Sequence, residues 1–204
     1  MEDIVRHQLL DRALELFRQV GVRLVHEEQL AAALDLTPAA FRDLLGSKAE
    51  VVAQVTRRNL ERQRREHAEL FANLSSPVEC LVALARHGLH ELRRSPHYDY
   101  YVIRTDYPLA WQAFQEHFYD YTCPLIKRLV HEGIAEGLFR AELEPALVAR
   151  ILLAQLNLVL NETYFPPDHI NLADVYFHVF SPYIRGLCTP AGLRLAAPLF
   201  ERMA

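Results

Sequence analysis

Ten histidines are spread along the chain, and two of them have a spacing that suits a shared metal ion. His87 and His90 are three positions apart, so a helix would present both imidazoles on one face, with Glu91 beside them. No second pair matches them. The His-Glu-x-x-His motif, the paired Glu-x-x-His motif of di-iron bundles, the glycine-rich phosphate loop and the Gly-x-Ser-x-Gly motif are all missing from the sequence. We therefore predict that the protein is not an enzyme and needs no metal or other cofactor.

The composition of the 204 residues limits the classes of protein that these side chains could belong to. With 51% hydrophobic and 24% charged residues it is typical of a soluble globular protein, and a net charge of −4 excludes a surface that is basic throughout. The three cysteines are widely spaced, as in proteins that keep reduced thiols in the cytosol. The acidic start of the chain does not resemble a signal peptide, and the longest apolar stretch, 151–160, is too short to span a bilayer. We expect a cytoplasmic protein with no membrane partner.

Apolar residues recur with helical periodicity through nearly the whole chain, and no alternating strand pattern or hairpin signal is present. The sequence therefore predicts an all-α fold, with an N-terminal three-helix head over 1–50, a connector helix over 51–75 and a helical bundle over 76–204. The polar stretch 57–66 predicts that the connector lies mostly in water. The start and stop signals predict helices over about 4–20, 27–34, 38–45, 47–73, 77–93, 108–136, 145–163, 171–186 and 190–202.

The first 50 residues have the spacing of a helix-turn-helix head. Three helices follow one another closely, and the link between the second and the third is very short. Ser47 and Lys48 begin the next helix, where backbone N–H groups and a cation could contact a DNA phosphate. Three-helix units also occur as plain helical caps, and the spacing alone leaves both interpretations open.

The sequence of these helices resembles the TetR/AcrR-type transcriptional regulators. Residues 10–21 resemble the first helix of that family, 28–37 its second helix and turn, and 41–51 the end of its recognition helix and the start of the fourth. Residues 133–140 resemble its corner between the seventh and eighth helices, and 183–193 resemble a C-terminal signature of one branch. The likeness covers nearly the whole chain. It implies a homodimer with a helix-turn-helix head for operator DNA and a bundle for an unidentified small-molecule effector.

The resemblance implies particular DNA-binding residues, although the head departs from the family pattern. Asp35 stands at the turn glycine, and Glu27 stands at an apolar core position. Residues 1–46 carry five arginines and eight acidic residues, whereas 47–72 carry six basic and four acidic residues. Because neutralisation of phosphate dominates DNA affinity, we expect weak or narrow DNA binding. The predicted DNA-binding residues are His26, Thr37, Ala39, Arg42 and Lys48, with pairing to a nearby acid as the other interpretation of Arg42.

The bundle is expected to hold both an effector pocket and a dimer interface. Apolar walls with a few polar groups suit a small molecule, and Arg104 would favour an anionic one if it pointed inward. An ordinary aromatic and aliphatic core is the other interpretation of both residue sets. The predicted pocket residues are His87, His90, Tyr101, Arg104, Trp111, Phe114 and Phe118. The predicted interface residues are Leu152, Gln155, Leu156, Val159, Phe177, Phe180 and Ile184.

Three functions from different classes are consistent with these features. The first is a regulator in which an effector in the bundle changes the separation of two DNA-binding heads. The second is a dimer of the same type that binds a small molecule or a partner but has lost DNA binding. The third and most distant is a helical metalloenzyme, which the metal content of the purified protein would distinguish from the other two.

Overall fold

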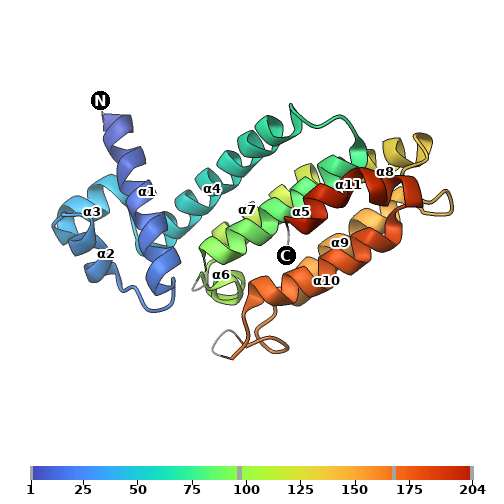
Figure 1. The fold of residues 1–204 in the computed structure, drawn as a ribbon. Coiled ribbons are helices and arrows are strands. Elements are labelled where there is room, and N and C mark those ends of the chain that lie inside the picture. The colour runs from blue at the N-terminus through green and yellow to red at the C-terminus, as the bar shows by residue number, and fades with distance from the viewer. Residues whose placement is uncertain (1, 96–97, 167–168, 203–204) are drawn as a thin grey trace. The chain divides into compact units, whose positions relative to one another are not determined.

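The computed structural model describes residues 2–95, 98–166 and 169–202. Every regular element in these ranges is a helix, so the predicted all-α fold class is confirmed. An antiparallel backbone bridge joins Phe139 to Cys188 outside the helices. In chain order (Figure 1) the elements are α1 (Glu2–Val20), α2 (Glu27–Ala33), α3 (Pro38–Leu45), α4 (Lys48–Phe71), α5 (Pro77–Arg94), α6 (Tyr100–Asp106), α7 (Pro108–Glu116), the π-helix η1 (His117–Thr122), α8 (Cys123–Ala135), α9 (Pro145–Val159), α10 (Leu172–Leu187) and α11 (Pro190–Glu201).

The chain divides into two compact units, and the division falls within α4. The first unit comprises Met1–Gln63 and Ser95–Glu116, which include α1 to α3, the first part of α4, α6 and α7. The second comprises Arg64–Arg94 and His117–Ala204, which include the end of α4 and the remaining helices. The domains proposed from the sequence follow chain order, whereas each unit joins segments that are distant in the sequence.

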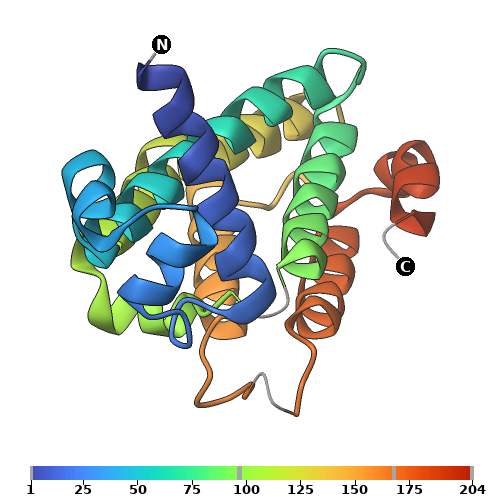
Figure 2. The ribbon, with the colours of Figure 1, turned by 90° about the vertical axis from the view of Figure 1, so that its left-hand side faces the viewer.

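An apolar stripe on α1 forms much of the core of the three-helix head, which is drawn in blue in Figure 2. Leu10, Ala13, Leu14 and Phe17 recur at helical spacing and are buried, as the sequence predicts, whereas Val20 at the end of the stripe is exposed. Burying a side chain such as Phe17 completely contributes about 1.5–3 kcal/mol relative to leaving it in water. The periodicity of α1 is therefore sufficient to explain its packing.

The turn between α2 and α3 requires a left-handed backbone conformation at Asp35, whose φ is 60°. An aspartate tolerates this conformation better than most residues, because its short polar side chain can make local hydrogen bonds. Arg12 Nη2 donates to Asp35 Oδ2 at 2.8 Å and to the Ala33 carbonyl at 2.7 Å. These contacts from α1 hold the turn, which is tight even without the glycine expected from the family resemblance.

The first part of α4 packs inside the first unit. Ser47 and Glu50 form a capping box, because Glu50 Oε2 accepts the Ser47 N–H at 2.7 Å and Ser47 Oγ accepts the Glu50 N–H at 3.4 Å. Asn59 and Leu60 are buried, so the prediction that the polar stretch lies mostly in water is wrong for these residues. Arg58 of α4 donates two hydrogen bonds to Asp11 of α1, from Nε to Oδ1 at 2.8 Å and from Nη2 to Oδ2 at 2.9 Å. Asn59 accepts a hydrogen bond from Arg18 of α1 and is buried, whereas the pair of Arg58 and Asp11 remains partly exposed to solvent.

The helix that the sequence predicts over 108–136 is interrupted in the structure. The α-helix α7 ends at Glu116, the π-helix η1 follows, and α8 begins at Cys123. Pro124 lies in the first turn of α8, where it has no N–H to donate to the preceding turn. The wider η1 turn precedes this proline and carries His117 and Tyr121, which contact the end of α4.

Other helix ends also differ from the predicted ones for local reasons. The predicted helix over 145–163 ends at Val159, and Asn161 Oδ1 accepts the Thr163 N–H at 3.0 Å. This turn, closed by the asparagine side chain, competes with the last helical turn. The aromatic segment that contains α6 is not assigned to a helix by the sequence analysis, because it is short and follows Pro96, which lies outside the described residues.

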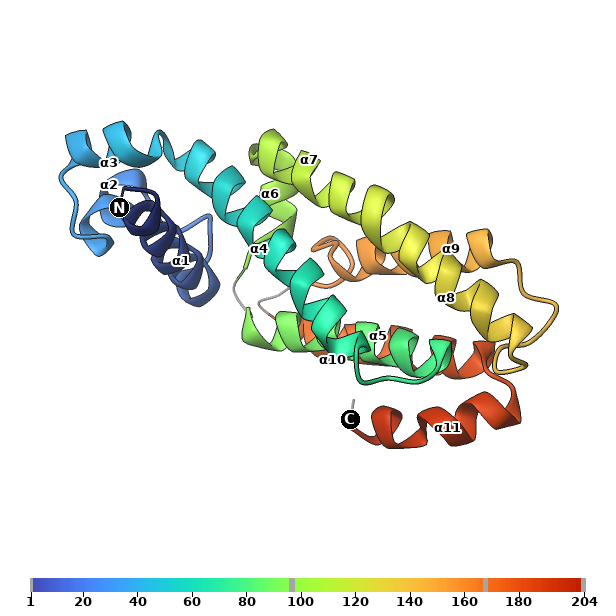
Figure 3. The ribbon, with the colours of Figure 1, turned by 90° about the horizontal axis from the view of Figure 1, so that it is seen from above.

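The second unit is a helical bundle in which α5 packs against α8, α10 and α11, while α9 packs against α8 and α10 (Figure 3). Close packing depends on two glycines. The Phe139 ring lies where a Cβ atom on Gly133 would be, and the Leu138 carbonyl lies where a Cβ atom on Gly192 would be. Within the described ranges, no helix is long and apolar enough to cross a membrane.

Candidate functional site

The exposed surface of α3 carries three of the residues that the sequence analysis assigns to DNA binding. Thr37 is the N-cap of α3, and its Oγ1 accepts the Ala40 N–H at 3.2 Å. Ala39 is exposed, and the side chain of Arg42 is 74% exposed. Asp43 is exposed beside them. The surface therefore offers one cation, one hydroxyl and apolar methyl groups, together with one carboxylate that would repel phosphate.

Glu27 of α2 binds two groups that a helix-turn-helix head could direct at a phosphate. Its Oε1 accepts from Arg42 Nε at 3.0 Å, and its Oε2 accepts the backbone N–H of Lys48 at 3.1 Å. The hydrogen bond from the Lys48 N–H, followed by the Arg42 guanidinium, lowers the pKa of Glu27 below its usual range. This carboxylate therefore occupies the N-terminus of α4 as an anion would. Of the two interpretations of Arg42, pairing with a nearby acid is the one seen in the structure.

Two other predicted DNA-binding residues also have contacts inside the first unit. Lys48 Nζ donates to the Val22 carbonyl at 2.7 Å and lies 5.7 Å from the centre of the Tyr107 ring. The exposed His26 is the N-cap of α2, and its backbone N–H donates to Gln29 Oε1 at 3.0 Å. A phosphate would have to compete with these partners for the Lys48 ammonium group.

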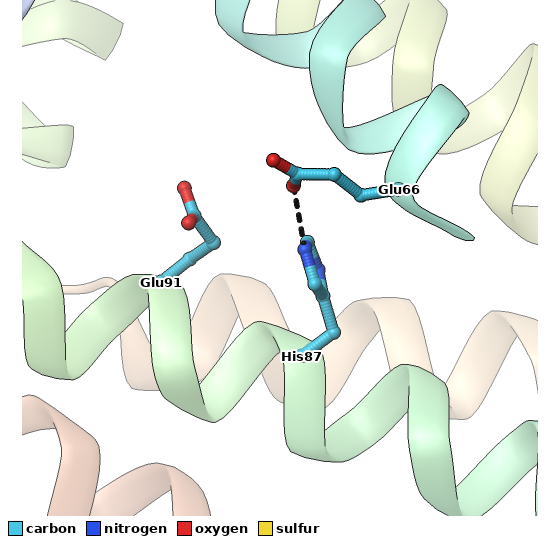
Figure 4. A group of neighbouring side chains, drawn as sticks. All are labelled: Glu66, His87 and Glu91. Atoms are coloured by element: carbon cyan, nitrogen blue, oxygen red, sulfur yellow. Dashed lines mark hydrogen bonds and ion pairs between the residues drawn. The ribbon is translucent and has the colours of Figure 1, made fainter. Parts of the chain in front are cut away.

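Polar side chains of the second unit form a chain of contacts between the end of α4, α5 and η1. His87 Nε2 lies 2.9 Å from Glu66 Oε2, and His87 Nδ1 lies 3.1 Å from His67 Nε2 (Figure 4). His67 Nδ1 lies 3.1 Å from the Tyr121 hydroxyl. Glu91 follows His87 by one helical turn, and one ligand atom from each of Glu66, His87 and Glu91 lies within 4.8 Å of the others. We call Glu66, His87 and Glu91 the polar triad.

Two buried histidines beside the polar triad are neutral at pH 7. Burial, and then the charges of His87 and His117, lower the pKa of His67 to about 3. Burial, and then the charge of Arg64, lower the pKa of His117 to about 4. His117 Nδ1 accepts from Arg64 Nε at 3.4 Å. Its surroundings are therefore suited to a neutral imidazole that accepts a hydrogen bond.

The predicted pocket residues are divided between the two units. Tyr101, Arg104, Trp111 and Phe114 belong to the first unit, and His87, His90 and Phe118 belong to the second. Arg104 is exposed, and its guanidinium carbon lies 5.6 Å from the centre of the Trp111 ring. It therefore does not point into the core of its unit, as an anion-binding role would require. The pocket as a whole stays a prediction.

Within the second unit, His87 and His90 line an open groove of about 400 Å³. The groove walls also carry the guanidinium groups of three arginines from α5 and from the end of the chain. The sequence analysis selected both histidines but missed Glu66, His67 and Tyr121. These come from α4 and η1, and no spacing along the chain relates them to His87. The complete lining is Leu70, Ala83, Arg86, His87, Leu89, His90, Arg93 and Arg202.

Four of the predicted interface residues lie inside the protomer. Leu152, Val159, Phe180 and Ile184 are buried in the chain itself, where they pack as core residues. Gln155, Leu156 and Phe177 are half-buried. The helical periodicity identified an apolar face of each helix correctly, but a sequence cannot distinguish the face that packs inside a chain from one that packs on a second copy.

The face of α9 that remains exposed carries a line of apolar residues, with the exposed Arg150 beside it. Leu147, Ile151 and Leu158 are 56%, 42% and 43% exposed, and Ala154 between them is also exposed. The four residues are spaced by four, three and four positions, so they form one continuous line along the helix. We call them the α9 stripe. Nothing in the sequence marks this line as more exposed than the line of Leu152 and Val159 beside it.

No family model matches the sequence, and no curated protein matches it. A TetR-family regulator from Agrobacterium tumefaciens matches the structure with a TM-score of 0.72 and 15% identity, over 93% of this chain and 100% of that chain. SmeT, the repressor of the multidrug efflux pump SmeDEF of Stenotrophomonas maltophilia, matches with a TM-score of 0.66 and 20% identity over 92% of both chains. The chain has the TetR-family fold.

A further structure with this TetR-like fold contains a bound small molecule. It is described as a transcriptional regulator from Saccharomonospora viridis in complex with choline, and it matches with a TM-score of 0.69 and 17% identity. The match covers 86% of this chain and 93% of that chain. The likeness confirms the architecture implied by the family resemblance, while the DNA-binding, pocket and interface residues stay predictions.

Proposed function

We propose that the protein is a ligand-responsive transcriptional regulator that binds operator DNA as a homodimer in the cytoplasm and represses transcription. The observation that carries this proposal is the exposed helix α3, capped by Thr37 and preceded by a tight turn, in a chain with the TetR-like fold. In such a head α3 would enter the major groove. Ala39 could contact a thymine methyl group, and Arg42 could reach a guanine or a phosphate.

The proposed response to ligand is a change in the separation of the two heads. An effector that binds the second unit more tightly in one conformation of the dimer would shift the population of that conformation. Two heads bind two half-sites only at a fixed spacing, so the shift would change operator affinity. The neighbours with this fold support both parts of the proposal, since one of them is a repressor and another binds choline.

The α9 stripe supports the proposed homodimer. A two-fold axis would place the stripe of one copy against the same stripe of the other, which is the usual arrangement of a symmetric dimer. The side chains of Leu147, Ile151, Ala154 and Leu158 would then be buried between the two copies and removed from water. The predicted residues Gln155, Leu156 and Phe177 are half-buried and could extend the contact.

A second candidate function is a dimer of the same fold that no longer binds DNA. The observation that favours it concerns Glu27, whose carboxylate accepts hydrogen bonds from both Arg42 and the Lys48 N–H. These two groups are then not available to a phosphate. The negative balance of residues 1–46 favours it as well. On this interpretation the chain would respond to a small molecule or a partner without an operator.

The two functions can be separated by selecting duplexes from random sequence on the purified protein and then measuring the affinity of the recovered site. A regulator enriches one related set of sequences, and Ala39→Asp weakens binding to them at least tenfold because it adds a negative charge to α3. Ala141→Asp adds the same charge at an exposed position of the second unit and serves as the control. Failure to enrich any sequence would favour the function without DNA binding.

A further inference from the structure

We propose that the polar triad Glu66, His87 and Glu91 binds a divalent transition-metal ion, with Zn²⁺ as the representative case. The three residues come from two helices of the second unit, Glu66 from the end of α4 and the other two from α5. Their candidate ligand atoms lie within 4.8 Å of one another, and Figure 4 shows the two carboxylates and the imidazole converging on one space.

The separations are close to those that a metal ion requires. Zinc lies about 2.0–2.2 Å from imidazole nitrogen and carboxylate oxygen, so ligand atoms around a tetrahedral ion are about 3.3 Å apart. His87 Nε2 and Glu66 Oε2 are already 2.9 Å apart. Small rotations of the Glu66 and Glu91 side chains would therefore close the site around an ion. Three protein ligands would leave the fourth position to water or to a further ligand.

The acidic character of the polar triad favours a cation as its ligand. The triad holds two carboxylates and one imidazole, and Glu91 is only 7% exposed. Two carboxylates and one imidazole are a ligand set that suits a divalent cation.

The contacts behind His87 are those of a supported metal ligand. A metal-bound histidine usually donates the N–H of its other ring nitrogen to a second group, which holds the ring in place. With the ion on Nε2, the Nδ1–H of His87 can donate to His67 Nε2, and the Nδ1–H of His67 can donate to the Tyr121 hydroxyl, each over 3.1 Å. His67 is buried and stacks parallel to Tyr121, so it holds the direction of this chain of hydrogen bonds.

The ligand set also indicates the class of metal. Imidazole nitrogen is a preferred ligand of zinc, cobalt, nickel and iron, whereas magnesium and calcium are bound by oxygen atoms. One nitrogen and two carboxylate oxygens therefore favour a first-row transition ion. The site requires no DNA binding, so it can be tested separately from the proposed regulator function.

The test is a titration of the full chain with Zn²⁺ after removal of metal by a chelator, followed by calorimetry, with Co²⁺ absorption as a second measurement. We expect one ion per chain, loss of that binding in His87→Ala and in Glu91→Gln, and a visible Co²⁺ band that disappears in the same variants. His67→Phe keeps all three ligands but removes the support for His87, and we expect it to weaken affinity by about 10–100-fold.

Two matched variants control for binding elsewhere. His131→Ala removes an exposed histidine from α8, and Glu69→Gln removes an exposed carboxylate from α4, so both should bind Zn²⁺ like the wild type. Circular dichroism of each variant checks the fold. The proposal would be overturned by wild-type affinity in His87→Ala and Glu91→Gln, by equal weakening in His131→Ala, or by displacement of Zn²⁺ by equimolar Mg²⁺.

Discussion

Glu27 makes contacts that bear directly on the proposed DNA-binding surface. The sequence places a carboxylate where the resemblance to TetR/AcrR-type regulators implies an apolar residue, and in the structure this carboxylate accepts hydrogen bonds from Arg42 and from the N-terminus of α4. Both are groups that a DNA phosphate would otherwise approach. The same residue therefore stabilises the head and competes with the proposed partner.

Replacing Glu27 by Gln should increase DNA affinity. The change removes the negative charge and frees the Arg42 guanidinium for phosphate, so log affinity should depend more steeply on log salt, by about 1 for each added phosphate contact. Fluorescence anisotropy of a labelled duplex over a salt series measures both effects. Glu28→Gln, the exposed neighbour, is the control for net charge alone. Equal effects of the two variants would mean that Glu27 does not mask a DNA-binding surface.

The left-handed conformation of Asp35 leads to a prediction about stability. Alanine at this position would retain an unfavourable positive φ and would lose the contact with Arg12, so Asp35→Ala should lower the free energy of unfolding by about 1–2 kcal/mol. Glycine accepts the same φ without strain, so Asp35→Gly should remain within about 1 kcal/mol of the wild type. Urea unfolding followed by circular dichroism would measure both. A glycine variant as unstable as the alanine variant would contradict this explanation of the turn.

At the scale of elements, periodicity and capping residues predict where helices lie but not what each face contacts. The stripe of α1 and the capping box before α4 are local signals, and the structure confirms both. The burial of Asn59 depends on contacts with α1, which are more than 40 positions away in the sequence. The interruption at η1 lies just before Pro124, whereas the sequence predicts one continuous helix over 108–136.

The α9 stripe leads to a prediction about the oligomeric state of the protein. If two copies associate through this stripe, Ile151→Glu would place two charges against each other in an apolar contact, and the dimer should dissociate. Light scattering after size-exclusion chromatography should then give the mass of one chain instead of two. Leu195→Glu changes an equally exposed leucine on α11 and should leave the dimer intact. A dimer that tolerates Ile151→Glu would place the interface elsewhere.

At the scale of the whole molecule, the all-α architecture was predictable and the polar triad was not. Helical periodicity and the ordered set of family-like segments covered nearly the whole chain, and the similar structures confirm that architecture. His87 was selected from its spacing to His90, but its partners in the structure are Glu66 and His67. Side chains from different helices meet through tertiary packing, for which the linear sequence carries no spacing rule.

The buried histidines predict how stability depends on pH. The pKa of His67 is about 3 and that of His117 about 4 in the folded chain, whereas unfolded histidine titrates near 6.5. Between pH 6.5 and pH 4 the unfolded state therefore binds more protons, and the free energy of unfolding falls as pH falls, by up to about 1.4 kcal/mol per pH unit for each histidine.

Urea unfolding at several pH values between 4 and 7 would test this dependence. His117→Gln removes one of the two titrating groups and should reduce the slope. His131→Gln, on the exposed surface of α8, should leave it unchanged. Stability that is independent of pH over this range in the wild type would contradict the burial of neutral histidines in the second unit.

Selective binding of DNA is the property on which the proposed regulator function depends. Fluorescence anisotropy of the purified protein with the duplex upstream of its own gene, over a salt series and beside a scrambled duplex, reports selectivity and phosphate contacts together. A selective regulator should bind the upstream duplex more tightly and lose affinity steeply as salt is added. Equal or absent binding to both duplexes, together with no enrichment from random sequence, would contradict it.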